Sequence, residues 1–136
     1  AAFGVDQMQH LESFLRIKKK NYERYLRNLK PFGLKMLDFT KIDQASYWFY
    51  SLLIPPNEYR LDREMLMQKL LDENIHSRPL WGLIHMQKPY RRFQEYRIEK
   101  AYFYADSILN VPCSTSLTVD EVDIVCDAII RILHLS

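Results

Sequence analysis

The residues best suited to chemistry lie in one short segment, residues 75–90. Six side chains in it can bind polar or flat ligands: His76, Arg78, Trp81, His85, Gln87 and Lys88. Pro79, Gly82 and Pro89 interrupt the segment too often for a single helix or strand. A loop rich in large and polar side chains usually faces a ligand or another domain, and we expect this one to do so.

Arg78 is the clearest candidate for binding an anion. A residue that precedes proline is held in extended backbone, so Pro79 fixes the point from which the guanidinium projects. The planar guanidinium matches the paired oxygens of a carboxylate or a phosphate. An intramolecular salt bridge is the alternative for Arg78. Core packing is the alternative for Trp81, and a hydrogen-bonded packing role is the alternative for His85.

The rest of the chain offers little catalytic machinery. It has no glycine-rich phosphate loop, no HExxH, no GxSxG and no metal-ligand spacing, so we predict no catalytic residue, no cofactor ligand and no metal site. The net charge of +2 argues against a dedicated nucleic-acid binder. No apolar run reaches the roughly 18 residues of a membrane span. Cys113 and Cys126 are predicted to be reduced thiols of a cytoplasmic protein.

The first elements position this segment from the amino-terminal side. Apolar residues at helical spacing predict one long helix that Pro31 and Gly33 end, with a stripe formed by Met8, Leu11, Leu15, Tyr22, Tyr25 and Leu29. Residues 34–39 alternate like a strand. Residues 45–54 form an aromatic and aliphatic run that also favours a strand. The helix and the strands should therefore alternate in the chain.

The remaining elements complete a small sheet with helices. Asp62 is predicted to cap a helix that Asn74 ends. Residues 99–109 are predicted to be helical and residues 110–113 extended. A capping box and a buried stripe predict the last helix, from Thr118 with Glu121 and from Val122, Val125, Cys126, Ile129, Ile132 and Leu133. The pattern predicts an α+β layer sandwich, a small mainly antiparallel sheet with helices on one face.

The chain begins without methionine and runs directly into the helical pattern. We therefore expect a fragment of a longer protein. Residues 1–30 would form a long bridging helix, and residues 31–136 a small domain.

Several motifs together resemble a known family. They are Ala1-Ala2-x-Gly4-x-x-Gln7-x-x-x-Leu11, then Tyr22 and Leu26, then Arg78-Pro79-x-Trp81-x-x-x-His85-x-Gln87-Lys88-Pro89-Tyr90, and Leu109-Asn110-Val111-Pro112-Cys113-Ser114. In this order they resemble the carboxy-terminal portion of the DegT/DnrJ/EryC1/StrS family of pyridoxal-phosphate-dependent nucleotide-sugar aminotransferases. The pieces look most like enzymes that aminate a UDP-4-keto-6-deoxy-N-acetyl sugar on the way to legionaminic acid or bacillosamine. One departure is Lys18-Lys19, where many relatives carry paired arginines.

The resemblance implies a division of labour. In that family the Schiff-base lysine and the carboxylate on the pyridinium nitrogen belong to a large amino-terminal domain. The parent would thus bind pyridoxal phosphate, act on a nucleotide-linked 4-keto-6-deoxy sugar with an amino-acid donor, and form a homodimer. This chain would resemble the small carboxy-terminal domain of fold-type I aminotransferases and be inactive alone. Arg78, Trp81 and His85 match the family's loop positions nearest the sugar pocket and would bind substrate.

Two other functions remain open from the sequence. One is a binding module in which the aromatic run from Tyr47 to Tyr50 and the basic loop grip a nucleic acid or a peptide. The other is a non-catalytic domain that mediates dimerisation, which would leave a large apolar patch on the isolated chain.

Overall fold

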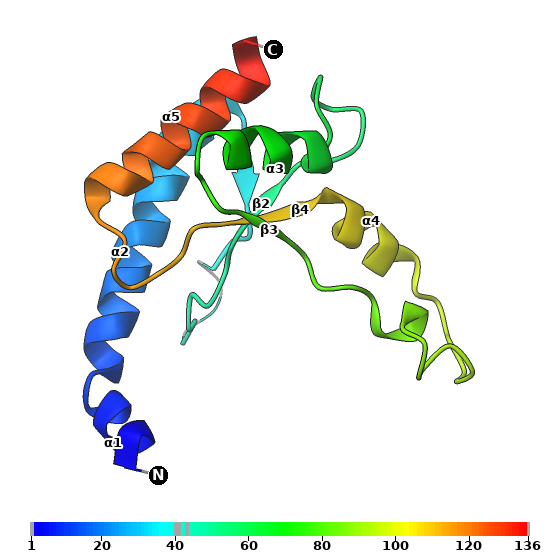
Figure 1. Ribbon diagram of the computed structural model, residues 1–136, viewed down its shortest axis with the longest axis horizontal. Coiled ribbons are helices and arrows are strands. Elements are labelled where there is room, and N and C mark those ends of the chain that lie inside the picture. Colours follow the sequence, from blue (N-terminus) through cyan, green and yellow to red (C-terminus); the bar gives the residue numbers. More distant parts are fainter. Residues whose placement is uncertain (1, 40–41, 43, 136) are drawn as a thin grey trace.

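The computed structural model describes residues 2–39, 42 and 44–135 (Figure 1). Ala1, with which both the resemblance and the predicted bridging helix begin, lies outside these residues. The elements are α1 (Ala2–Gln9), α2 (Leu11–Leu29), η1 (Lys30–Phe32), β1 (Lys35–Met36), β2 (Tyr50–Leu53), α3 (Arg63–Asp72), β3 (Arg78–Pro79), η2 (Ile84–Met86), α4 (Glu99–Ser107), β4 (Ile108–Val111) and α5 (Val119–Leu135). The strands form one antiparallel sheet in the order β1-β2-β4-β3. The predicted α+β class with a small antiparallel sheet is confirmed.

The amino-terminal helix is interrupted where the sequence predicts one continuous helix. α1 ends at Gln9 and α2 begins at Leu11, with His10 between them. No residue of α1 is buried, whereas α2 buries Tyr22, Tyr25 and Leu29. Tertiary packing supplies most helix stability, and the described residues of α1 contribute no buried side chain that would extend the packing of α2 toward the amino terminus.

The strands are shorter than the sequence predicts, and one boundary is wrong. Only residues 35–36 and 50–53 of the two predicted strands pair. Leu109, predicted as the end of a helix, lies instead in β4. This strand is central, because β2 pairs with one edge of it and β3 with the other. Ladder pairing on both sides outweighs the local helical pattern.

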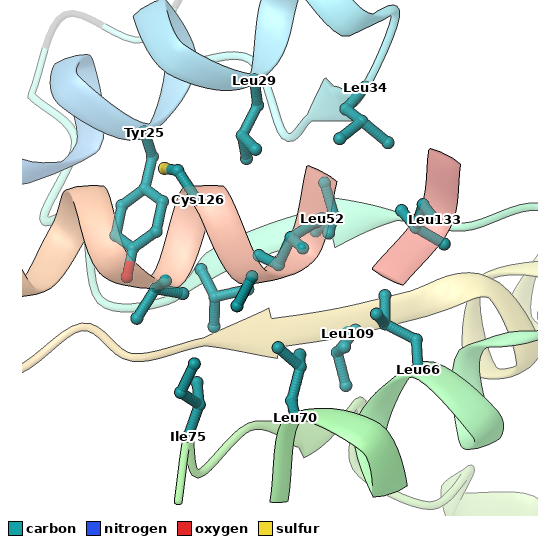
Figure 2. Close-up of a cluster of buried hydrophobic side chains, with 14 of the residues drawn as sticks. Tyr25, Leu29, Leu34, Leu52, Leu66, Leu70, Ile75, Leu109, Cys126 and Leu133 are labelled. Atoms are coloured by element: carbon teal, nitrogen blue, oxygen red, sulfur yellow. The ribbon is translucent and has the colours of Figure 1, made fainter. Parts of the chain in front are cut away.

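One face of the sheet forms the core (Figure 2). Tyr50, Leu52, Leu109 and Val111 are buried on it. The helices α2, α5 and α3 cover this face, with α5 in contact with both others. Leu66 and Leu70 of α3 and the whole predicted stripe of α5 are buried. Helices on one face of the sheet are therefore confirmed.

Both predicted helix starts have the expected caps. The Asp62 carboxylate accepts a hydrogen bond of 2.8 Å from the Met65 backbone N–H. Asn74, with φ of 61°, ends the same helix region. At α5 the Glu121 carboxylate accepts from the Thr118 backbone N–H at 2.7 Å, and the Glu121 N–H donates to the Thr118 hydroxyl at 3.2 Å. These bonds satisfy backbone groups that a helix end leaves free.

Two buried ionisable groups in the core are held neutral. Burial raises the pKa of the Cys126 thiol to about 12. Burial also raises the pKa of Tyr25, whose ring lies beside that of Tyr50 at 5.5 Å. Because a thiol rather than a thiolate is present, Cys126 is a packing residue and not a nucleophile. Within the described part of the chain, no helix is long and apolar enough to span a membrane.

Candidate functional site

Arg78 lies on an edge strand, where the sequence of β3 requires it to be. Pro79 has no N–H to donate to a ladder, so this dipeptide belongs at a sheet edge. Arg78 pairs in register with Asn110 of β4, and Asn110 pairs with Ser51 of β2. The Ser51 hydroxyl donates to the Asn110 side-chain oxygen at 2.7 Å. This polar row lies on the sheet face opposite the core, with the exposed guanidinium at its end.

Two shallow cavities meet at Arg78. One, of about 220 Å³, is lined by Phe49, His76, Arg78, Asn110 and neighbours in the 111–113 segment. The other, of about 280 Å³, shares His76 and Arg78 and adds residues of α3 and Ser77. Among the residues that the structure describes, the Arg78 guanidinium has no ion pair and no hydrogen bond. The predicted alternative of an intramolecular salt bridge is not found there.

Trp81 joins an exposed aromatic group that we call the tryptophan cluster, formed by Trp48, Phe49 and Trp81. The rings of Trp48 and Phe49 are stacked, with centroids 5.0 Å apart and planes 14° apart. Trp81 meets both rings edge-on, at 5.8 Å and 5.9 Å. Trp48 is 62% exposed and Trp81 is 68% exposed. Trp81 is therefore not a core residue, which was the alternative for it.

Lys18 of α2 connects the tryptophan cluster to the helices by hydrogen bonds. Its ammonium donates to the carbonyl of Trp48 at 3.1 Å and to the carbonyl of Cys113 at 2.8 Å. The same ammonium lies 5.5 Å from the ring centroid of Tyr50, whose hydroxyl donates to the Lys18 carbonyl at 2.7 Å. One side chain of α2 thus fixes the chain before β2 and the chain after β4.

His85 belongs to a different part of the molecule. It lies in η2, within the arm of residues 80–107 that extends away from the sheet in Figure 1. Its Nε2 atom lies 2.9 Å from the hydroxyl of Tyr102 in α4, and the two rings are 5.2 Å apart. This contact ties η2 to α4. The described contacts of His85 do not reach Arg78 or Trp81.

The structure thus brings together two of the three predicted substrate-binding residues. Phe49 connects them, because it lines the Arg78 cavity and contacts Trp81. Sequence reasoning did not nominate Trp48, Phe49 or Asn110. The first two lie in the aromatic run that was interpreted as a strand and, in the alternative of a binding module, as a surface for a nucleic acid or a peptide. Asn110 is identified as a neighbour of Arg78 only by strand register. Whether these residues bind substrate stays a prediction.

The cavities at Arg78 do not fit pyridoxal phosphate by themselves. Neither is lined by a lysine that could form a Schiff base, among the described residues. Lys18, the one half-buried lysine in the described ranges, has its ammonium bonded to two carbonyls. In the same ranges no group of three or more His, Cys, Asp or Glu could hold a metal ion.

Comparison with known proteins gives a consistent picture. The model of the DegT/DnrJ/EryC1/StrS aminotransferase family matches residues 1–130. The GDP-perosamine synthase of Vibrio cholerae is 27% identical over 134 residues, which are 95% of this chain and 35% of that protein. Helicobacter pylori PseC, an aminotransferase of pseudoaminic acid biosynthesis, shares the fold with a TM-score of 0.87 and 15% identity, over 99% of this chain and 37% of that one.

Streptococcus pneumoniae Spr1654 in its PLP form also shares the fold, with a TM-score of 0.81 and 20% identity over 95% of this chain and 33% of that one. The chain thus spans about a third of the length of the relatives it matches.

Proposed function

The chain belongs to the DegT/DnrJ/EryC1/StrS aminotransferase family, and from that premise we propose that it is the small carboxy-terminal domain of a sugar aminotransferase. The full-length enzyme transfers an amino group from an amino-acid donor to a nucleotide-linked 4-keto-6-deoxy sugar. Pyridoxal phosphate supplies the carbanion chemistry when bound. The Schiff-base lysine lies in the part of the enzyme that this chain does not span, and the chain alone is inactive.

The observation that carries this proposal is the family match over residues 1–130. The free guanidinium of Arg78 and the exposed face of Trp81 support a substrate-binding role for this part of the enzyme. Arg78 holds paired anionic oxygens, and Trp81 covers a flat or apolar part of the same substrate. His85, oriented by Tyr102, borders the substrate from the arm.

The substrate is proposed more finely as a sugar of surface polysaccharide or nonulosonate biosynthesis. The resemblance favours a UDP-linked N-acetyl sugar, whereas the Vibrio cholerae relative is a GDP-perosamine synthase. The two possibilities differ in the base and at the sugar carbon that carries the acetamido group. Both demand recognition of a diphosphate, and they therefore share the role assigned to Arg78.

The test uses the full-length protein with pyridoxal phosphate and an amino-acid donor. It is supplied in turn with UDP-linked and GDP-linked 4-keto-6-deoxy sugars, and the amino sugar is measured by mass spectrometry. Arg78→Ala is expected to lower kcat/KM about 10- to 100-fold, the loss expected on removing a charged hydrogen bond. Arg27→Ala, which removes an exposed arginine of α2, is the control. Absence of an amino sugar from either substrate would contradict the proposal.

A purely assembling role is the second candidate, and exposed apolar residues in α1 favour it. Phe3, Val5 and Met8 are 79%, 62% and 66% exposed. Such a surface in a chain of this size usually contacts another surface. This role predicts concentration-dependent self-association in light scattering, abolished by Phe3→Ser with Met8→Ser, together with normal kcat/KM of the full-length Arg78→Ala variant.

A further inference from the structure

The cavities at β3 are lined by an arginine and a histidine. His76 and Arg78 line both cavities, and no Asp or Glu lines either one among the residues that the structure describes. In those residues neither side chain has a hydrogen-bond partner or an ion pair. A cationic site without a neighbouring carboxylate attracts anions, because no internal partner competes for the guanidinium.

A buried polar atom at the same place lacks a partner. The Ser77 hydroxyl, between His76 and Arg78 in the chain, is buried and makes no hydrogen bond to any residue that the structure describes. Buried polar groups in folded proteins are nearly always paired, so an unpaired one marks a place where something is missing or strained. Ser77 lines the 280 Å³ cavity together with Arg78, whose guanidinium is also unpaired among the described residues.

An aromatic surface adjoins the cationic cavity. Phe49 belongs to both, since it lines the 220 Å³ cavity and stacks against Trp48. Phe49 therefore connects the cavity lined by His76 and Arg78 to the exposed rings of Trp48 and Trp81. Flat heterocycles stack on such faces whatever their exact identity, because every base has a π-face. The Lys18 bonds to the carbonyls of Trp48 and Cys113 hold this surface against the sheet.

We propose that His76 and Arg78 bind the diphosphate of a nucleoside diphosphate and that the tryptophan cluster stacks on its base. The inference rests on the proposed function and deepens it, because it assigns the nucleotide part of the substrate to this third of the enzyme. Arg78 takes two phosphate oxygens with its planar guanidinium, and a ring N–H of His76 donates to a third. The carboxylate of an amino-acid donor can also pair with Arg78, but it has no ring that would stack on the tryptophan cluster.

The two tryptophans of the chain are both in the cluster, so fluorescence excited selectively at tryptophan, and not at the nine tyrosines, reports on this site. The 136-residue chain is titrated with UDP and with GDP, and separately with inorganic phosphate and with glutamate. We expect saturable quenching by both nucleotides. Phosphate should compete weakly without quenching, and glutamate should neither quench nor compete.

Variants connect the signal to the proposed residues. Arg78→Gln should weaken nucleotide binding at least about 10-fold, as removal of a charge-assisted hydrogen bond does, whereas Arg27→Gln leaves it unchanged. His76→Gln should weaken it about 2- to 10-fold and serves as the second variant if Arg78→Gln fails to fold by circular dichroism. Trp81→Leu, measured by calorimetry, should weaken nucleotide binding more than phosphate binding.

Three results would overturn the proposal: no saturable quenching by either nucleotide, equal affinities of Arg78→Gln and Arg27→Gln, or displacement of the nucleotide by glutamate at lower concentration than by phosphate. These outcomes are separate from failure of the proposed function. If the chain binds the nucleotides but the full-length protein forms no amino sugar, the proposed aminotransferase function is contradicted and the proposed nucleotide site is supported. If the full-length protein forms the amino sugar but the chain does not bind the nucleotides, the proposed site is contradicted and the nucleotide must bind to another part of the enzyme.

Discussion

On the outer side of α2 and α5, Arg24 and Asp123 form two parallel hydrogen bonds of 2.7 Å and 2.6 Å, and Asn28 donates to the same carboxylate. At the β3 edge, Arg78 and His76 line two cavities, and neither side chain has such a partner in the part of the chain that the structure describes. The cavity between α2 and α5 is much larger, about 760 Å³ against 220 and 280 Å³. Its arginines are already occupied, since Arg131 also binds Glu73 at 2.6 Å.

The two regions differ in whether their arginines are already paired with a carboxylate of the fold. A guanidinium that already has a carboxylate gains little from a ligand, because binding must first break the internal pair. A free guanidinium on a rigid edge strand is ready to bind without rearrangement. Judged by volume alone, the cavity between α2 and α5 would be the candidate ligand site. Judged by the presence of an arginine without a carboxylate partner, the candidate site is the β3 edge. The comparison can be tested by changing each region in turn.

The largest effect is expected in the layer that both regions share. Leu109→Ala empties a fully buried position of β4, which is central in the sheet. It should lower the free energy of unfolding by about 2–5 kcal/mol, as measured by urea denaturation. Leu71→Ala on α3, a leucine that is 45% exposed, is the matched control and should cost much less. Equal losses for the two variants would contradict the placement of the core.

Lys18 connects the helical layer to the tryptophan cluster, and its loss should affect both. Lys18→Met removes a cation from two backbone carbonyls and should destabilise the chain by about 1–3 kcal/mol. Because Trp48 loses its anchor, its fluorescence emission should also shift. Lys20→Met, on an exposed position of the same helix, is the control. A normal emission spectrum in a destabilised Lys18→Met variant would show that the lysine does not position the cluster.

The paired region should respond to pH. The Arg24 guanidinium holds the pKa of the Asp123 carboxyl below its usual range, with a smaller contribution from Asn28. A carboxyl with a depressed pKa stabilises the fold above its unfolded pKa of about 4, and this stabilisation is lost as pH falls through the folded value. Asp123→Asn should therefore lower Tm near neutral pH and bring the variant closer to the wild type in acid. Asp127→Asn, one turn further along α5, should show neither change.

A smaller effect distinguishes two tyrosines of α2. The Tyr22 hydroxyl donates to the Leu37 carbonyl at 2.6 Å, whereas the buried Tyr25 hydroxyl has no hydrogen-bond partner among the described residues. Tyr22→Phe should cost about 1 kcal/mol. Tyr25→Phe should be neutral or stabilising by up to about 1 kcal/mol, because it removes an unpaired polar atom. A clear loss of stability in Tyr25→Phe would indicate that this hydroxyl has a partner in the folded chain.

Local chemistry made several elements of the fold predictable. Asp62, Asn74 and the Thr118–Glu121 capping box act within one helical turn, so their residue types identify the helix ends. The α5 stripe was likewise predictable, because one face of that helix is buried along its whole length. Leu109 shows where this reasoning fails. Pairing with both β2 and β3 places it in β4, and no local pattern reports on strands that are distant in the sequence.

The site was predictable only in part for the same reason. Arg78 and Trp81 stand out by type and by their neighbouring prolines and glycine. Their neighbours Phe49, which precedes β2, and Asn110, in β4, lie about 30 residues away on either side of Arg78 in the chain. Only the order of the strands in the sheet brings them to Arg78. His85 was grouped with Arg78 because both match loop positions of the family that the sequence resembles. The structure places His85 beside Tyr102 of α4, a contact that no local sequence pattern indicates.

In the site proposed to bind substrate, Arg78 is free for a ligand and does not support the fold. Urea denaturation of Arg78→Ala tests this most directly. Since the guanidinium has no partner among the described residues, the free energy of unfolding should change by no more than about 0.5 kcal/mol, as for a surface substitution. A loss of several kcal/mol would contradict the claim, because it would show that the folded chain already uses the guanidinium that we assign to the substrate.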